Sequence, residues 1–513
     1  MPNQQRPLNV LWLMTDEQRA DSLGLYGSHW AVSPHLDDLA RGAMVFRHAY
    51  TPSPVCMPAR LSILSGQHPC ETGVWLNEGS PGVMFESLLE PFHEAGYASA
   101  TFGKQHYGGR DRAFGTEKSL VISEAVSPYD YAPPHRREDY GAIKHTDKWI
   151  LGGTFPVDIE ERRERQAVRA ALQWLDELQD DTPFLLRLSF SAPHTPVVPP
   201  APFDTMIPES AIDLPPEADR LIGEAPKWLT KQLDVRGSHL LKPEEIGPMR
   251  RFYYGETAFV DHAFGLLLEA MRQKGLLENT VIAFLSDHGT HLGDQGLVQK
   301  GTFFDASARV PFFVRLPSAD PRSGRYVETP VSTISLLPTL LDIAGLPVPE
   351  RVRELSLADV VRGHGSAPAQ PVFSEIGSEI YAGSGEKEDH RLVMVRDGDY
   401  KLMINADVPT SGGVLVNVAE DPHETRNLYH SAEHRSVRDR LVRVVEEHLA
   451  GTGPIKVFAK ELDELRIDDQ GRVLCTTCRS AMSREVPVGS GWCEGFARAF
   501  ACQHCGQRFG IAL

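Results

Sequence analysis

Four short apolar runs in the sequence are each followed by side chains that can bind a metal or transfer a proton. The runs with the side chains after them are 9–15 with Asp16 and Glu17, 98–103 with Lys104 and His106, 184–190 with His194, and 281–286 with Asp287 and His288. A single aspartate in such a place is often only a helix cap. Four such places together indicate one shared site.

The side chains in these places suit an anionic substrate and a divalent cation. Asp16, Asp287 and His288 offer two carboxylates and an imidazole, with Glu17 as an open fourth candidate. Oxygen-rich ligation favours Ca²⁺, Mg²⁺ or Mn²⁺, and a histidine ligand shifts the balance towards Mn²⁺ or Zn²⁺; Ca²⁺ or Mn²⁺ is expected. Three further side chains would stabilise a tetrahedral oxyanion by their positive charge: Lys104, His106 and Lys300. The alternative for each is an ordinary solvated or structural side chain.

The elements that position these side chains are predicted to be buried strands. The runs are short, apolar and bounded by polar residues, glycine or proline. Helical patterns at 161–180 and 332–344 alternate with them, the second with Pro338 at its kink or start. This order predicts an α/β domain at 1–365, with a mostly parallel sheet covered on both faces. In such sheets ligands bind at the carboxyl ends of the strands.

A smaller α+β unit is predicted at 366–455. A linker-like stretch at 362–371 precedes short strand patterns at 372–375, 391–396, 400–404 and 413–417, with a hairpin turn at Asp397-Gly398 and a closing helix at 436–450. The proline-rich stretch 193–216 is expected to be an irregular surface loop.

Residues 456–513 form a cysteine-rich tail. Two pairs, Cys475 with Cys478 and Cys502 with Cys505, are separated by 23 residues and are typical of a tetrahedral structural zinc site. Free thiols or a disulfide remain the alternative, and Cys493 is then spare. Cys70, in the N-terminal part, is interpreted as an incidental thiol.

Composition narrows the function classes. Acidic residues outnumber basic ones, 69 to 52, which argues against broad nucleic-acid binding. No run approaches the roughly 20 apolar residues of a membrane span, and the polar N-terminus lacks a signal-peptide core. A cytoplasmic location is expected, and the odd count of 7 cysteines argues against a disulfide framework. A homo-oligomer is expected if the tail clamps a neighbouring subunit.

The segment Cys56-Met57-Pro58-Ala59-Arg60, which runs on as LSILSG to Gly66, resembles the signature of the sulfatase family. Four other segments resemble family segments in the same order: TDEQRAD at 15–21, GKQHYG at 103–108, SDHGTHLGDQG at 286–296 with Lys300 and SARVPFFVR after it, and VLVNVAEDPHETRNL at 414–428. The resemblance spans roughly residues 8–450. It implies an alkaline-phosphatase-like fold and a formylglycine made from Cys56 by a formylglycine-generating enzyme.

The resemblance also implies a role for each site residue. One hydroxyl of the aldehyde hydrate at position 56 would attack the ester, and deprotonation of the other would release the covalent product. Asp16, Asp287, His288 and modified Cys56 would bind the metal, while Glu17 stays open. The other roles would be orientation of the hydrate by Arg60, contacts to the ester oxygens by Lys104 and Lys300, base catalysis by His106, acid catalysis by His194 and a substrate contact by Asn77.

Three functions remain open on the sequence. Hydrolysis of small anionic sulfate esters is the leading hypothesis. Phosphonate-monoester or phosphodiester hydrolysis with the same nucleophile is the nearest alternative, and the presence of both Lys104 and His106 favours the sulfatase interpretation. An inactive binding or scaffold protein on this fold is the third, although every catalytic position is occupied. The alcohol half of the substrate is not identified.

Overall fold

The protein is described here from a computed structural model. It describes residues 6–77, 89–106, 118–121, 143–146, 149–156, 158–179, 181–216, 221–317, 324–350, 352, 354–377, 390–450, 452, 484–486, 496–501 and 508–512. Among these residues no helix has the length and apolar composition that crossing a membrane requires.

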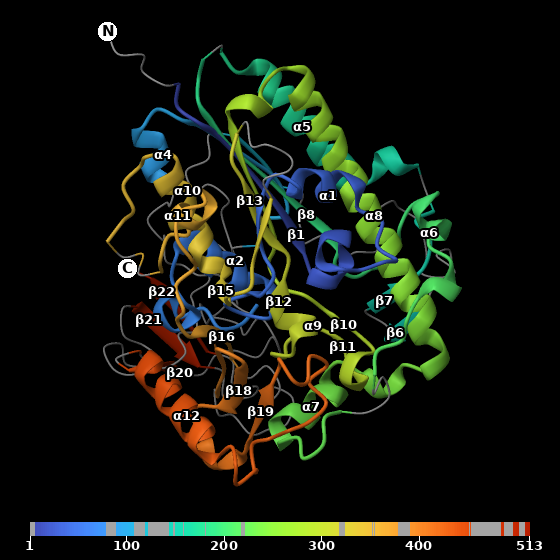
Figure 1. Ribbon diagram of the computed structural model, residues 1–513, viewed down its shortest axis with the longest axis vertical. Helices are drawn as coiled ribbons and strands as arrows, with labels where there is room; N and C mark the ends of the chain where they lie inside the picture. Colours follow the sequence, from blue (N-terminus) through green and yellow to red (C-terminus); the bar gives the residue numbers. More distant parts are fainter. Residues whose placement is uncertain are drawn as a thin grey trace.

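An eight-stranded sheet forms the centre of the molecule (Figure 1). Its order is β14 (Arg325–Val327), β2 (Met44–Phe46), β13 (Phe312–Arg315), β9 (Thr280–Ser286), β1 (Asn9–Asp16), β8 (Phe184–Pro193), β4 (Ala98–Gly103) and β5 (Lys118–Val121). Only β13 pairs antiparallel with its neighbours among these strands. The predicted mostly parallel sheet is confirmed, and the four predicted strands are its central neighbours β9, β1, β8 and β4.

Helices cover both faces of this sheet, because each central strand is apolar on both sides. In β1, Val10, Trp12 and Met14 join one buried core, and Leu11 and Leu13 join the other. The first core is closed by α2 (Cys56–Ser65), α4 (Glu90–Glu94), α10 (Leu336–Ile343) and α11 (Ala358–Val361). The second is closed by α1 (Pro34–Ala40), α5 (Arg163–Glu177) and α8 (Pro243–Gln273).

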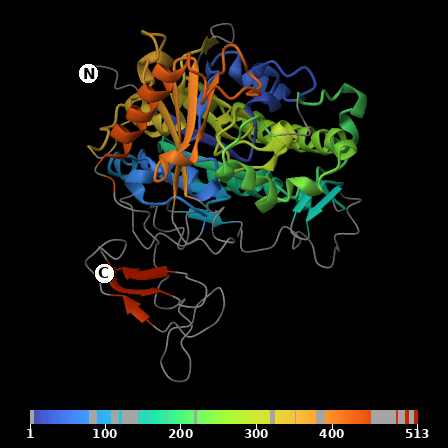
Figure 2. The same cartoon turned by 90° about the horizontal axis from the view of Figure 1, so that it is seen from below.

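A second, antiparallel sheet lies beside the first (Figure 2). It consists of β16 (Val372–Gly377), β17 (Arg391–Asp397), β18 (Tyr400–Asn405) and β19 (Gly413–Asn417), and α12 (Arg435–Leu449) packs against it. The predicted strands and helix are therefore present. The hairpin turn lies one residue later than predicted: Asp397 pairs with Tyr400, so Gly398 and Asp399 form the turn. Gly398 takes the positive φ (57°) that such turns favour.

The other predicted elements differ in detail. The 332–344 pattern is a short 3-10 turn (Thr333–Ser335) followed by α10, which accommodates Pro338 in its first turn. The 193–216 stretch is not wholly irregular, since it contains α6 (Phe203–Met206) and a 3-10 turn (Glu209–Ala211).

The predicted zinc site of the tail is not tested by the structure. The cysteines of the tail all lie outside the described residues; they are Cys475, Cys478, Cys493, Cys502 and Cys505. The free cysteines among the described residues are Cys56 and Cys70. Zinc binding by Cys475, Cys478, Cys502 and Cys505 therefore stays a prediction from their spacing.

Smaller elements complete the description. They are β3 (Ala49–Tyr50), β6 (Ile143–Thr146), β7 (Trp149–Gly152), β10 (His291–Leu292), β11 (Val298–Gln299), β12 (Arg309–Val310), β15 (Val331–Ser332), β20 (Arg484–Val486), β21 (Phe496–Ala501), β22 (Arg508–Ala512), α3 (Pro69–Thr72), α7 (Lys227–Val235) and α9 (Asp305–Ala308). The strands β20, β21 and β22 form an antiparallel sheet of their own.

Candidate active site

The carboxyl ends of four neighbouring strands deliver the predicted side chains to one place. β1 ends at Asp16, β9 is followed by Asp287 and His288, β4 by Lys104, and β8 by His194. Asp16, Asp287 and His288 are completely buried. The sheet order thus brings together residues that are hundreds of positions apart, as the strand-end pattern predicts.

Cys56 is the first residue of α2 and points into this group. Its Sγ lies 3.1 Å from Lys300 Nζ, 3.2 Å from His288 Nε2 and 3.7 Å from Asp16 Oδ1. All of α2 is buried, and Gly66 ends the helix in a left-handed conformation with φ 66°. The positive end of the helix dipole adds to the positive charge around the sulfur.

Arg60 sits one turn further along α2 and holds the two aspartates. Its Nε donates to Asp287 Oδ2 at 2.6 Å, and its terminal nitrogens donate to Asp16 Oδ2 at 2.9 Å and to Ser189 Oγ at 2.9 Å. The guanidinium is fully buried. A buried arginine with this many acceptors fixes the geometry of its partners.

The donor atoms of Asp16, Cys56, Asp287 and His288 all lie within 4.8 Å of one another. Two carboxylates, an imidazole and a modifiable side chain in a buried place fit a divalent cation. The electrostatics agree: burial opposes a charge on His288, but Asp287 and Cys56 raise its pKa to about 9. The group is rich in negative charge and attracts a cation.

Cationic side chains surround the same group. Burial opposes ionisation of Cys56, but Lys300, Lys104 and His288 together hold its pKa well below the ordinary value. Burial and Cys56 likewise oppose ionisation of Asp16, and Lys104 and Arg60 outweigh them, so its pKa is also well below the ordinary value. Lys104 Nζ lies 2.8 Å from Asp16 Oδ2. The place is therefore built to hold negative charge.

Glu17 belongs to a neighbouring group. Its carboxylate lies 3.2 Å from Lys300 Nζ and 3.5 Å from His194 Nε2, and it accepts from Thr290 Oγ1 at 2.7 Å. Its donor atoms group with Asp16 and His194 rather than with Cys56 and His288. Ligation of the metal by Glu17 stays a prediction.

Two predicted residues lie at the border of the site. His106 is half-buried, takes a positive φ of 53°, and helps to lower the pKa of Cys56 by a hydrogen bond. Asn77 Oδ1 accepts from the backbone N–H of Met57 at 2.8 Å, which caps the start of α2. The structure thus gives Asn77 a positioning contact, and its predicted substrate contact is untested.

The sequence did not single out several residues that support the site. Ser189 accepts from Arg60, Thr290 donates to Glu17, and Thr51 Oγ1 donates to the carbonyl of Asp287. Tyr253 donates to the carbonyl of Glu17 at 2.7 Å. Hydroxyl groups are common everywhere in a chain, and only the tertiary contacts reveal these four.

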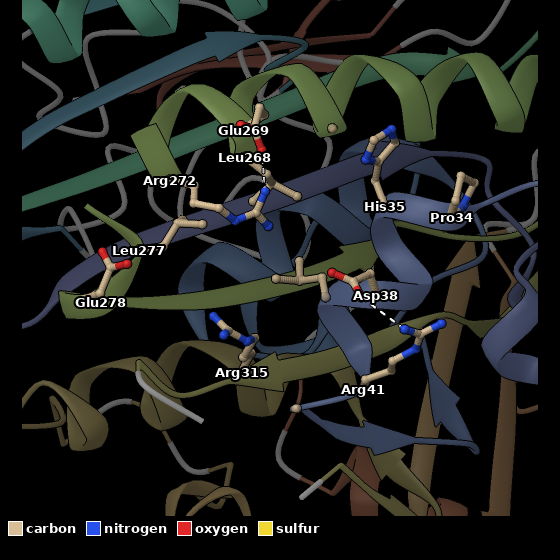
Figure 3. Close-up of a pocket in the computed structure, with 13 residues that line it drawn as sticks. Pro34, His35, Asp38, Arg41, Leu268, Glu269, Arg272, Leu277, Glu278 and Arg315 are labelled. Carbon is tan, nitrogen blue, oxygen red and sulfur yellow. Dashed lines mark hydrogen bonds and ion pairs between the residues drawn. The ribbon is translucent and has the colours of Figure 1, made fainter. Parts of the chain in front are cut away.

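A pocket of about 710 Å³ lies elsewhere, between α1, the end of α8 and Arg315 (Figure 3). Arg315 pairs with Ile282 near the start of β9, whereas the catalytic group follows the end of that strand. The pocket is therefore at the opposite edge of the sheet. None of its lining residues belongs to the group around Cys56.

Comparison with known proteins identifies the chain. A family model described as Sulfatase matches residues 8–346, and one described as N-sulphoglucosamine sulphohydrolase, C-terminal, matches 293–450. The chain belongs to the sulfatase family. The expected alkaline-phosphatase-like fold is confirmed, and sulfate-ester hydrolysis is the activity that this membership supports.

Several relatives cover most of this sulfatase. An ulvan-active sulfatase of Formosa agariphila is 28% identical, over 87% of this chain and 81% of that protein. A choline-sulfatase of Rhizobium meliloti is 29% identical, over 82% of each. Among solved structures, a phosphonate monoester hydrolase from Silicibacter pomeroyi superimposes with a TM-score of 0.73 at 25% identity, over 90% of this chain and 98% of that one.

Proposed function

We propose that this sulfatase hydrolyses sulfate esters with a formylglycine derived from Cys56. The observation that carries the proposal is the place of Cys56: the first residue of α2, with Lys300, His288 and Asp16 within 3.1–3.7 Å of its sulfur. The hydrate of the aldehyde would supply the attacking hydroxyl group. Maturation then requires a formylglycine-generating enzyme as a partner.

The chain's own side chains account for the other needs of the reaction. Lys300 contacts the sulfur of Cys56, and Lys104 contacts the neighbouring carboxylate of Asp16. Both ammonium groups would therefore be placed to bind the non-bridging oxygens of an ester at position 56. His194 would protonate the leaving oxygen, and His106 would accept a proton from the spare hydroxyl of the hydrate. Arg60 would hold Asp16 and Asp287 in place.

The cation would be held by Asp16, Asp287, His288 and residue 56, whose donor atoms are already gathered. When bound, a divalent cation would act as a Lewis acid that favours the ionised nucleophile. The carboxylate oxygens favour Ca²⁺ or Mn²⁺.

Hydrolysis of phosphonate monoesters is the second candidate. It is favoured by the similarity to the phosphonate monoester hydrolase, which spans 98% of that chain. Both esters present an anionic tetrahedral centre to the nucleophile, so the same cationic side chains would serve both. The presence of both Lys104 and His106 favours sulfate as the better substrate.

Peptide mass spectrometry on protein from the native host, combined with a substrate panel, tests the proposal. The peptide that contains residue 56 should show an aldehyde oxygen in place of the sulfur. Matched aryl sulfate and aryl phosphonate esters should then be hydrolysed with sulfate preferred. An unmodified thiol in active protein would refute the formylglycine, and a dominant phosphonate activity would reverse the choice of substrate.

A further inference from the structure

A second group of metal-binding side chains lies at the junction of α3, β16 and α12. His68 immediately precedes α3, Glu375 lies in β16, and His448 lies in the last turn of α12. One donor atom from each of the three residues lies within 4.8 Å of the other two. None of the three belongs to the catalytic group.

Glu375 makes this junction unusual. Its side chain is fully buried, and among the described residues its ion-pair partners are His68 and His448 only. One carboxylate oxygen accepts from the backbone N–H of Cys70 at 2.8 Å, which fixes its orientation. A buried carboxylate needs a positive charge nearby. Two protonated imidazoles with centroids 4.8 Å apart would repel each other, whereas one cation would satisfy all three groups.

The distances suit a tetrahedral ion. Donor atoms around a tetrahedral zinc lie roughly 3.3–3.8 Å apart, given bonds of about 2.0–2.3 Å. His68 Nδ1 lies 3.6 Å from Glu375 Oε1, which is within this range. A second edge, from His448 Nε2 to Glu375 Oε1, is a 2.6 Å hydrogen bond. Loss of its proton on metal binding would free both atoms as ligands.

The surroundings resemble those of a protein-built metal site. Glu354 faces the other ring nitrogen of His68 at 3.7 Å, and it accepts from Gln370 at 2.9 Å. A carboxylate behind a ligating histidine is a usual feature of zinc sites, because it orients the ring. His448 stacks on Phe373 at 3.7 Å, which fixes its ring as well. The carbonyl end of α12 adds negative potential to the place.

We propose that His68, Glu375 and His448 form a structural site for Zn²⁺ in this protein. Two imidazoles and one carboxylate favour Zn²⁺ over Ca²⁺ or Mg²⁺, which prefer oxygen ligands. The ion would tie the segment that follows α2, which carries Cys56, to the C-terminal sheet and its helix.

Zinc content of the full-length protein tests the site. The wild type, the double variant His68→Gln/His448→Gln and the control His364→Gln, an exposed histidine, are stripped with a chelator, reloaded with Zn²⁺ and desalted. The double variant should bind one zinc per chain fewer than the other two proteins, because its catalytic group and tail cysteines are intact. Added zinc should raise the thermal midpoint of the wild type by more than that of the double variant. Equal zinc contents in all three would overturn the proposal.

A second measurement needs no variant. Diffraction from zinc-loaded wild-type crystals at the zinc edge should place an anomalous peak between His68, Glu375 and His448. If the double variant does not fold, this peak decides the matter, and its absence would overturn the site.

Discussion

At the scale of the residue, the contacts of the two ring nitrogens of His194 determine which of them can act in catalysis. Its Nδ1 lies 2.6 Å from the carbonyl oxygen of Thr195, so that nitrogen carries a proton and donates it. Nε2 faces the site, 3.5 Å from Glu17 and 4.0 Å from Asp16. Because Nδ1 is held by the carbonyl of Thr195, Nε2 is the ring nitrogen that could pass a proton to a leaving oxygen in the site.

We expect His194→Gln to lower kcat/KM strongly only for esters with a poor leaving group. Alkyl sulfates should lose about 10²–10⁴-fold, the usual contribution of a general acid. 4-Nitrophenyl sulfate should lose less than about tenfold, because its phenolate leaves without protonation. Steady-state kinetics with both esters measures the difference. An equal loss on the two would show that His194 binds or positions the ester instead.

The site residues at strand ends were predictable from the sequence, whereas their supports were not. Asp16, Lys104, His194 and Asp287 each follow an apolar run, and parallel strands bring such positions together. Ser189 lies inside β8, and its contact with Arg60 depends on strand register and on the direction of α2. Register and helix direction are tertiary properties, so sequence patterns do not reveal them.

At the scale of the element, α2 is buried along its whole length, and the glycine that ends it is tightly packed. Gly66 takes φ 66°, and a Cβ there would lie 2.8 Å from a side-chain carbon of Val352. A substitution therefore combines left-handed strain with a clash in a buried core. The helix that carries Cys56 and Arg60 would have to move.

Gly66→Ala should destabilise the protein by about 2–5 kcal/mol, the sum of roughly 1–2 for the backbone strain and 1–3 for the clash. Gly345→Ala is the matched control, since Gly345 follows α10 with φ 73° and has nothing within 4 Å of the added atom. Gly345→Ala should lower the free energy of unfolding only by the roughly 1–2 kcal/mol that the backbone strain costs. Urea unfolding of both variants measures their free energies of unfolding. Equal losses in the two variants would mean that the Val352 side chain moves aside without destabilising the protein.

The longest helix shows where element prediction from sequence fails. α8 begins with PEEIGPMRRFYYG, which contains two prolines and two glycines and argues against a helix. Met249, Tyr253 and Tyr254 of this stretch are almost completely buried. Tertiary burial overrides local propensity there. The central strands were predictable because their apolar runs are short and bounded by polar, glycine or proline residues.

At the scale of the whole molecule, a buried charge cluster joins the antiparallel C-terminal sheet to α9 of the preceding part of the chain. Lys401 of β18 has a fully buried side chain and pairs with Asp305 of α9 at 2.6 Å and with Glu424. Glu424 also accepts from the backbone N–H of Asp305 at 2.6 Å. Burial raises the pKa of Glu424 to about 7, with Lys401 opposing that shift and Asp305 adding to it.

This cluster gives stability a defined pH dependence. Between the ordinary pKa of 4.5 and about 7, the folded protein holds a proton on Glu424 that the unfolded chain has released. The free energy of unfolding therefore falls as the pH rises through this window. Lys401 makes this decrease in the free energy of unfolding smaller, because its charge stabilises the ionised carboxylate of Glu424.

Lys401→Met should therefore destabilise the protein more at higher pH. Two buried carboxylates would then lack their ammonium partner, which costs about 3–5 kcal/mol when both are ionised, near pH 8. Near pH 5 a proton on Glu424 removes one charge, and the penalty should be roughly 1–2 kcal/mol smaller. Urea unfolding of the wild type and the variant at each pH gives their two free energies of unfolding, and the penalty is the difference between them. Groups that titrate identically in both proteins do not contribute to this difference. Lys227→Met, at an exposed position, should show no penalty at any pH. A penalty for Lys401→Met that stays constant with pH would mean either that Glu424 does not change its ionisation over this range or that Lys401 acts only by packing.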